Sequence, residues 1–122
     1  MNKRDPKLIA LQFNEYINNR DIKGLSSLMS EDHIFIDRQG DSYGDMVNGW
    51  MEFFENFPTY KNIFTKVESR DNLVILIGYA KWSKDSLKED HAIWTATIED
   101  DLVVKWQIYS DTKENRKKLK IF

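Results

Sequence analysis

Asp37 and His33 are the residues whose types and spacing are best suited to proton transfer. They bound the sequence His-Ile-Phe-Ile-Asp at positions 33–37, in which an apolar strand ends in a carboxylate before a polar turn. In an apolar pocket the pKa of Asp37 would rise, because desolvation disfavours the charged form, and Asp37 would become a base near neutral pH. Alternatively, Asp37 caps the turn or pairs with Arg38 or His33.

His33 is the first candidate helper of this base. It shares a strand face with Asp37, since side chains alternate along a strand, and precedes it by four residues. The carboxylate could then orient the imidazole, although a purely structural histidine is the competing interpretation. Tyr16 and Tyr60 are further candidate hydroxyl donors. We name Asp37 as the candidate base, with His33 or Tyr16 as its helper.

Large aromatic rings are the candidate walls of a ligand pocket. The chain of 122 residues has 7 Phe, 5 Tyr and 4 Trp, enough to line a cavity for a flat apolar or aromatic molecule. The rings that we assign to ligand binding are Phe13, Trp50, Phe54, Trp94 and Trp106. Simple core filling is the alternative. His91 has the opposite strand parity to Trp94 and is expected to face outward.

Composition argues against several other functions. With no cysteine there is no thiolate metal site or cysteine nucleophile, and the two histidines show no metal-ligand spacing, so we expect no metal and no cofactor. A formal net charge of −2 predicts neither nucleic-acid nor membrane binding. The longest apolar run, 73–77, is too short to cross a bilayer. A cytoplasmic protein is expected.

Three helices are predicted in the N-terminal half, at 5–19, 21–29 and about 45–56, from capping aspartates and apolar residues at helical spacing. The short strand 33–37 falls between the second helix and the third. These elements would bring the candidate base and Trp50 together.

From residue 60 onward the hydrophobic period changes to two. Four long strands joined by short connections predict an antiparallel meander, at 60–69, 73–82, 91–99 and 102–110 with a loop at 83–88. Both faces of 73–82 are apolar, and three helices cannot cover both faces of a sheet. A second subunit would cover the far face, so we predict a homodimer. The basic tail from Asp111 is expected to be a short, solvated helix.

This order of elements resembles a known superfamily. The turn from Asp37 to Gly44, the helix with Trp50 and the ending Trp-Thr-Ala-Thr-Ile-Glu-Asp-Asp-Leu-Val-Val-Lys-Trp-Gln-Ile-Tyr-Ser-Asp are similar to nuclear transport factor 2-like proteins, and more narrowly to SnoaL-like proteins. The resemblance spans Leu8 to Asp111. It implies one domain over 1–122 of the α+β class, a cone-shaped half-barrel whose curved, mostly antiparallel sheet has three helices on its concave face.

The resemblance implies a pocket without naming a reaction, because the superfamily includes ketosteroid isomerases, polyketide cyclases, epoxide hydrolases and pure binding proteins. Asp37 falls at the general-base position of a ketosteroid isomerase. Phe13 and Trp94 occupy the positions of its oxyanion donors, which disfavours steroid isomerisation. Trp106 followed by Asp111 resembles the base region of SnoaL cyclases, and the last two strands lack the arginine of limonene-type epoxide hydrolysis.

Two functions are consistent with these observations. The first is binding of a small apolar or aromatic molecule, with or without cofactor-independent proton transfer. The second is a non-catalytic dimeric or protein-interaction module with a filled core.

Overall fold

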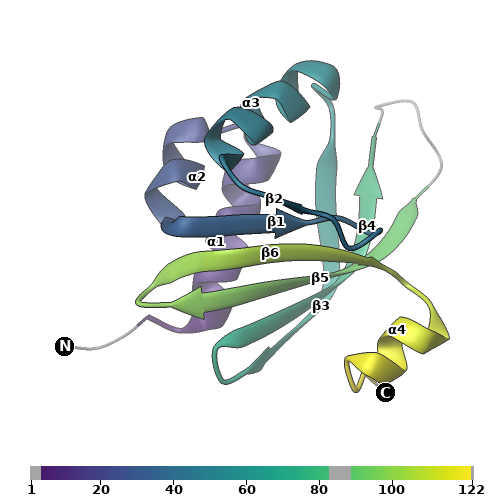
Figure 1. The fold of residues 1–122 in the computed structure, drawn as a ribbon. Helices are drawn as coiled ribbons and strands as arrows, with labels where there is room; N and C mark the ends of the chain where they lie inside the picture. The colour runs from purple at the N-terminus through teal and green to yellow at the C-terminus, as the bar shows by residue number, and fades with distance from the viewer. Residues whose placement is uncertain (1–3, 83–88, 122) are drawn as a thin grey trace.

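The computed structural model describes residues 4–82 and 89–121, so the predicted loop 83–88 lies outside the described residues. Two helices, two strands and a third helix make up the N-terminal half, and strands dominate the C-terminal half (Figure 1). The elements are α1 (Pro6–Asn18), α2 (Ile22–Leu28), β1 (Met29–Ile36), β2 (Ser42–Tyr43), α3 (Met46–Asn56), β3 (Lys61–Arg70), β4 (Leu73–Lys81), β5 (Asp90–Glu99), β6 (Leu102–Ser110) and α4 (Lys113–Lys118). The predicted α+β class is confirmed.

The strands form one open, six-stranded sheet in the order β2-β1-β6-β5-β4-β3. Strands β3 to β6 are the predicted antiparallel meander, and β1 is added to it parallel to β6. The register sets Phe35 of β1 and Ala96 of β5 on either side of Trp106 of β6. One face of the sheet therefore collects the large rings.

Aspartates begin the first two helices. The Asp5 carboxylate accepts a hydrogen bond from Lys7 N–H with Pro6 at the first helical position, and the Asp21 carboxylate accepts one from Gly24 N–H. Gly24 is needed for packing, since an added Cβ would overlap the Tyr16 ring. The short α2 can therefore lie directly against α1.

The boundaries of the first strand were predicted wrongly. Strand β1 begins at Met29, which was assigned to the second helix, and not at His33. Glu31 and Asp32 are exposed, so the hydrophobic pattern does not reveal the first half of β1. The pairing of Met29 with Val103 of β6 shows that the strand begins there. The predicted turn 38–44 also contains the two-residue strand β2.

The main core lies between α1, α2, α3 and one face of the sheet, and its largest fully buried rings are Trp94, Trp106 and Phe13. Figure 1 shows these three helices together, with α4 apart from them at the C-terminal end of the chain. No helix in the described ranges is long and apolar enough to span a membrane.

The C-terminal segment covers part of the opposite face of the sheet. Ile121 is 6% exposed and packs in a second apolar cluster with Ile75, Ile77 and Ile93. The Arg70 guanidinium donates to the carbonyl oxygens of the two residues before Ile121 and fastens the segment. The predicted short helix is present as α4 and has no buried residue, but the segment that follows it is not solvated as expected. The apolar far face of β4 therefore no longer requires a second subunit.

Candidate functional site

A cavity of about 410 Å³ lies between α3 and the inner face of the sheet. All four tryptophans line it: Trp50 from α3, Trp94 from β5, Trp106 from β6 and Trp82 at the end of β4. A volume of this size falls within the range of small-molecule sites, roughly 300–1,000 Å³. The core is thus incompletely filled, and its open space is bounded mainly by aromatic rings.

Helix α3 supplies one wall because its lining residues recur at helical spacing. Met46, Gly49, Trp50 and Phe53 face the cavity and leave Val47 of the same helix exposed. The Trp50 ring is stacked against Phe54 with centroids 5.6 Å apart, and the edge contact of Trp50 with Phe53 is 5.7 Å. These contacts fix the indole plane.

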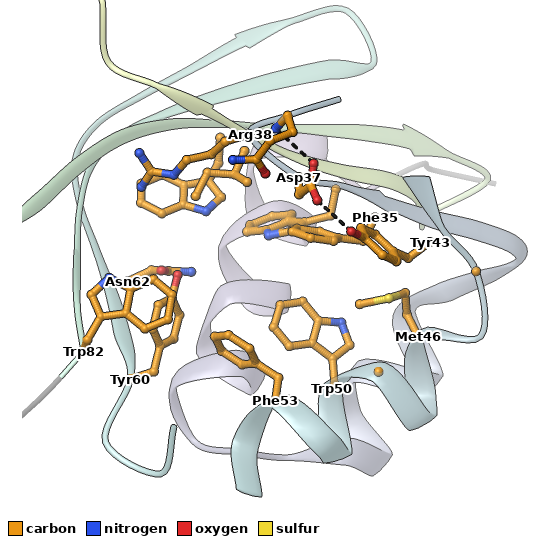
Figure 2. A pocket seen from close by; sticks show the side chains of 16 residues that line it. Phe35, Asp37, Arg38, Tyr43, Met46, Trp50, Phe53, Tyr60, Asn62 and Trp82 are labelled. Carbon is orange, nitrogen blue, oxygen red and sulfur yellow. Dashed lines mark hydrogen bonds between the residues drawn. The ribbon is translucent and has the colours of Figure 1, made fainter. Parts of the chain in front are cut away.

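The two ends of the cavity differ in their side chains. Figure 2 shows Tyr60, Asn62 and Trp82 at one end, and Tyr43 and Met46 at the other. Tyr60 is 5% exposed, and its ring lies 4.6 Å from that of Trp82. Since Tyr60 and Asn62 are two residues apart at the start of β3, they face the same side of the sheet.

An ion pair stands beside the Tyr60 end. The Arg38 guanidinium lines the cavity and donates to Asp90 Oδ2 at 2.7 Å, and the Trp82 indole N–H donates to the same oxygen at 3.1 Å. Arg38 also reaches Ser110 Oγ at 3.3 Å. The Tyr60 end of the cavity therefore brings together residues from the turn after β1, the end of β4, β5 and β6.

Asp37 lines the cavity and also holds its own turn. Its Oδ1 accepts hydrogen bonds from the backbone N–H groups of Gln39 and Asp41, both at 3.0 Å, and the Tyr43 hydroxyl donates to Oδ2 at 2.7 Å. The Tyr43 hydrogen bond lowers the pKa of Asp37, and the backbone N–H groups add to this effect against a smaller opposing effect of burial. The rise expected for an apolar pocket is absent because the carboxylate is partly exposed and well hydrogen-bonded.

Asn62 is fixed by two asparagines of α1. Its side-chain amide donates to Asn14 Oδ1 at 3.1 Å, and its backbone exchanges hydrogen bonds with the Asn18 side chain. Within the described ranges, Asn62 Oδ1 and Trp50 Nε1 are buried and have no hydrogen-bond partner. A buried polar atom of this kind costs about 1–3 kcal/mol, and native structures contain few of them.

No protein-family model matches this sequence, and the search of curated proteins finds no match. Solved structures do match. A protein of unknown function from Cytophaga hutchinsonii, described as nuclear transport factor 2-like, superposes with a TM-score of 0.73 at 16% identity over 97% of this chain and 96% of its own. A candidate SnoaL-like polyketide cyclase from Shewanella putrefaciens superposes with a TM-score of 0.74 at 13% identity, over 98% of this chain and 88% of its own. A candidate ketosteroid isomerase from Kribbella flavida superposes with a TM-score of 0.73 at 12% identity, over 88% of this chain and 78% of its own.

The chain has the nuclear transport factor 2-like fold. At these identities the likeness establishes the fold alone, and the neighbours named for different reactions illustrate why the fold does not select one.

Within this nuclear transport factor 2-like fold, five of the candidate residues named from the sequence line the cavity: Asp37, Trp50, Tyr60, Trp94 and Trp106. Phe13 and Phe54 lie behind the wall. Phe13 is fully buried and contacts the Trp106 ring at 4.9 Å, while Phe54 supports Trp50 from within α3. These two rings position the wall without lining it.

His33 and Tyr16 are placed elsewhere. His33 Nδ1 donates to the Val103 carbonyl at 2.6 Å, and its ring packs 5.7 Å from Phe13. Tyr16 packs against Gly24 between α1 and α2. Neither residue is among those lining the cavity.

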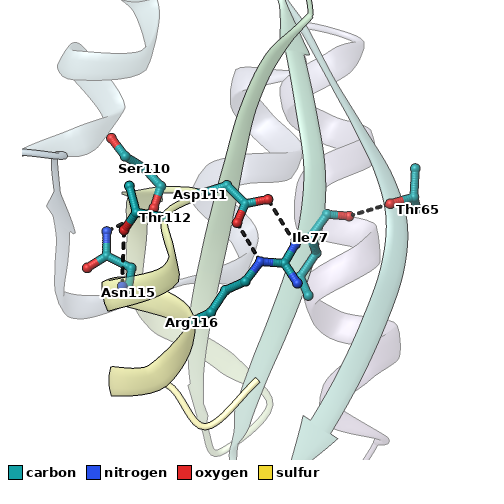
Figure 3. Close-up of polar contacts among 7 residues, drawn as sticks. All are labelled: Thr65, Ile77, Ser110, Asp111, Thr112, Asn115 and Arg116. Atoms are coloured by element: carbon teal, nitrogen blue, oxygen red, sulfur yellow. Dashed lines mark hydrogen bonds and ion pairs between the residues drawn. The ribbon is translucent and has the colours of Figure 1, made fainter. Parts of the chain in front are cut away.

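Asp111 is paired on the outer side of the sheet with the C-terminal helix. Both of its carboxylate oxygens accept hydrogen bonds from the Arg116 guanidinium, at 2.6 and 2.9 Å, as Figure 3 shows. Arg116 lowers the pKa of Asp111. His91 lies on the outer face as expected, exposed and 5.7 Å from the Tyr79 ring.

Several cavity residues escaped sequence reasoning, chiefly Arg38, Tyr43, Phe53, Asn62 and Trp82. A signal existed for Phe53, which shares the apolar stripe of α3 with Trp50, and for Asn62, which alternates with Tyr60. Arg38 and Trp82 are far apart in sequence and meet only through Asp90. In the part of the chain that the structure describes, no group of three or more His, Cys, Asp or Glu residues could hold a metal ion.

Proposed function

We propose that this protein binds a small, flat, mainly aromatic molecule in the cavity between α3 and the sheet. The observation that carries the proposal is the 410 Å³ space walled by four tryptophans. Indole faces favour flat apolar ligands through burial and ring stacking.

Filling the cavity tests this proposal. An added Cβ at Gly49 would lie 2.9 Å from Met46 Sδ, the flexible end of a side chain that also lines the cavity. Gly49→Leu should therefore occupy the space while replacing a poor helix former by a good one. We expect roughly tenfold or greater loss of affinity for a naphthalene probe, measured by tryptophan fluorescence, with no loss of melting temperature.

Val47→Leu is the matched control, because Val47 is on the exposed side of the same helix. Equal binding by wild type and Gly49→Leu would contradict occupation of the cavity. A wild type that binds no aromatic probe would favour the interaction module instead.

Cofactor-independent proton transfer is a second candidate function, supported by a carboxylate on the cavity wall. The lowered pKa keeps Asp37 deprotonated at neutral pH, and the Tyr43 hydroxyl orients it. Such a base would act weakly, since a low pKa reduces the driving force for taking a proton.

Asp37→Asn tests this role, because the amide keeps an oxygen for the two backbone N–H groups of the turn. We expect loss of about 10²–10⁴ in the rate of deuterium exchange next to the carbonyl of 2-tetralone, followed by nuclear magnetic resonance, with binding retained. An unchanged exchange rate would leave Asp37 with a structural role alone.

A further inference from the structure

The Tyr60 end of the cavity combines two hydrogen-bond donors from distant parts of the chain. Tyr60 packs on Trp82, the Trp82 indole donates to Asp90, and Asp90 holds the Arg38 guanidinium. Both Tyr60 and Arg38 line the cavity. This chain of contacts fixes a phenol and a guanidinium at the same end of an otherwise aromatic space.

The position of Tyr60 is set from behind the cavity. Arg20 donates to the Tyr60 carbonyl at 2.5 Å and to the Asn18 carbonyl at 2.6 Å, which ties the end of α1 to the start of β3. Burial raises the pKa of Tyr60 well above its usual value, and Asp90 adds to this rise, while the charge of Arg38 and a hydrogen bond with the Asn62 side chain oppose it only in part. The hydroxyl therefore keeps its proton and can donate a hydrogen bond.

Arg38 is preorganised and largely neutralised. Its Nη2 is taken by Asp90, while the 3.3 Å contact of Nη1 with Ser110 is long for a hydrogen bond. The pair with Asp90 has no net charge, and Asp37 adds a negative charge to the cavity wall. An uncharged oxygen acceptor fits these charges better than a carboxylate does.

We propose that Tyr60 Oη and the Arg38 guanidinium form a donor subsite for the carbonyl oxygen of an uncharged aromatic ligand. The inference rests on the proposed function and narrows its ligand class to aromatic ketones and related flat carbonyl compounds. Trp50 and Phe53 face the ring system, and the carbonyl lies toward β3.

A series of three naphthalenes tests the subsite by isothermal titration calorimetry. 2-Acetylnaphthalene has the carbonyl, 2-isopropylnaphthalene has a similar shape without an acceptor, and 2-naphthoate has a charged acceptor. We expect the ketone to bind roughly tenfold more tightly than either of the other two. Equal binding of the ketone and the hydrocarbon, or tighter binding of the carboxylate, would overturn the inference.

Two variants locate the effect. Tyr60→Phe and Arg38→Met should each bring the ratio of the affinities for 2-acetylnaphthalene and 2-isopropylnaphthalene, measured on the same variant, close to one. Tyr109→Phe, which removes a hydroxyl on the outer face of β6 near Ile93, is the matched control and should keep the preference. Preference retained in both cavity variants would overturn the subsite.

The two proposals fail in different ways. If all three naphthalenes bind wild type equally, the cavity binds aromatic molecules without this subsite. If none of them binds, the proposed function fails and the subsite with it. The wild-type series decides this even if a variant does not fold.

Discussion

Asp37 illustrates how one side chain can be assigned two roles from the same position. At the end of an apolar strand it resembles a general base, and the structure does place it on the cavity wall. The hydrogen bonds from Gln39 and Asp41 also make it the anchor of its turn. Its lowered pKa follows from these partners and from Tyr43, which only the folded turn brings close.

His33 has a testable effect on stability. Because Nδ1 donates to the Val103 carbonyl, the neutral ring has its lone pair on Nε2, which is buried without a partner among the described residues. Burial lowers the pKa of His33 below the usual 6.5. As the pH falls through about 6.5, His33 therefore takes up a proton in the unfolded chain but not in the folded protein.

The stabilising contribution of neutral His33 should thus be complete above about pH 6.5 and be lost as the pH falls toward the lowered folded-state pKa. Urea unfolding at a series of pH values should give a slope at most about 1.4 kcal/mol per pH unit steeper in wild type than in His33→Gln in this window. His91→Gln removes an exposed histidine as the control. Parallel slopes in wild type and His33→Gln would rule out the effect.

At the scale of elements, the pairing of β3 with β4 depends on Gly78. A Cβ at this position would overlap the Ile63 carbonyl oxygen, next to the irregular register between Phe64 and Lys66. The two backbones approach more closely here than an alanine allows.

Gly78→Ala should therefore destabilise the protein by roughly 2–4 kcal/mol in urea unfolding, because backbone and not a flexible side chain must move. Gly44→Ala is the control, since an added Cβ at Gly44 meets no atom within 4 Å. Similar stability of the two variants would show that the strands can separate at little cost.

The C-terminal segment is a second element with a measurable contribution. Burial of Ile121 against Ile75, Ile77 and Ile93 should be worth about 2 kcal/mol. Ile121→Asp should lose at least that much in urea unfolding and increase hydrogen exchange in β4 and β5. Lys117→Asp, at an exposed position of α4, is the control, and equal stability of both variants would mean that the segment does not stabilise the sheet.

At the scale of the whole molecule, a homodimer remains a prediction, but a different face of the sheet now supports it. The C-terminal segment covers the apolar outer residues of β4 and β5, so the original argument from β4 no longer applies. Ile34 and Ile36, paired with Lys105 and Gln107, are only half-buried on the outer side of β1 and β6. Burial of these isoleucines would favour self-association.

Sedimentation equilibrium should show a dimer in wild type and weaker association in Ile34→Lys, which adds a charge to that face. Leu8→Lys, at an exposed apolar position on α1, is the control. A wild type that is monomeric at all concentrations would contradict the prediction.

The sequence alone determined the local features of this protein. Capping aspartates at 5 and 21, the apolar stripe around Trp50 and the change to period two after residue 60 depend on neighbours in the chain, so pattern and propensity were sufficient for the α+β class and the meander. The resemblance to nuclear transport factor 2-like proteins added the correct fold.

Only the tertiary structure decided which side chains share the cavity and which lie behind it. Arg38 and Tyr60 come to one end through Asp90 and Trp82, and Ile121 covers the outer face of a strand more than 40 positions earlier. Such contacts depend on the register and curvature of the sheet, which no local pattern encodes. The fold also decided the pKa direction of His33, which follows from burial, whereas the lowered pKa of Asp37 follows mainly from Tyr43 and the backbone N–H groups of its own turn.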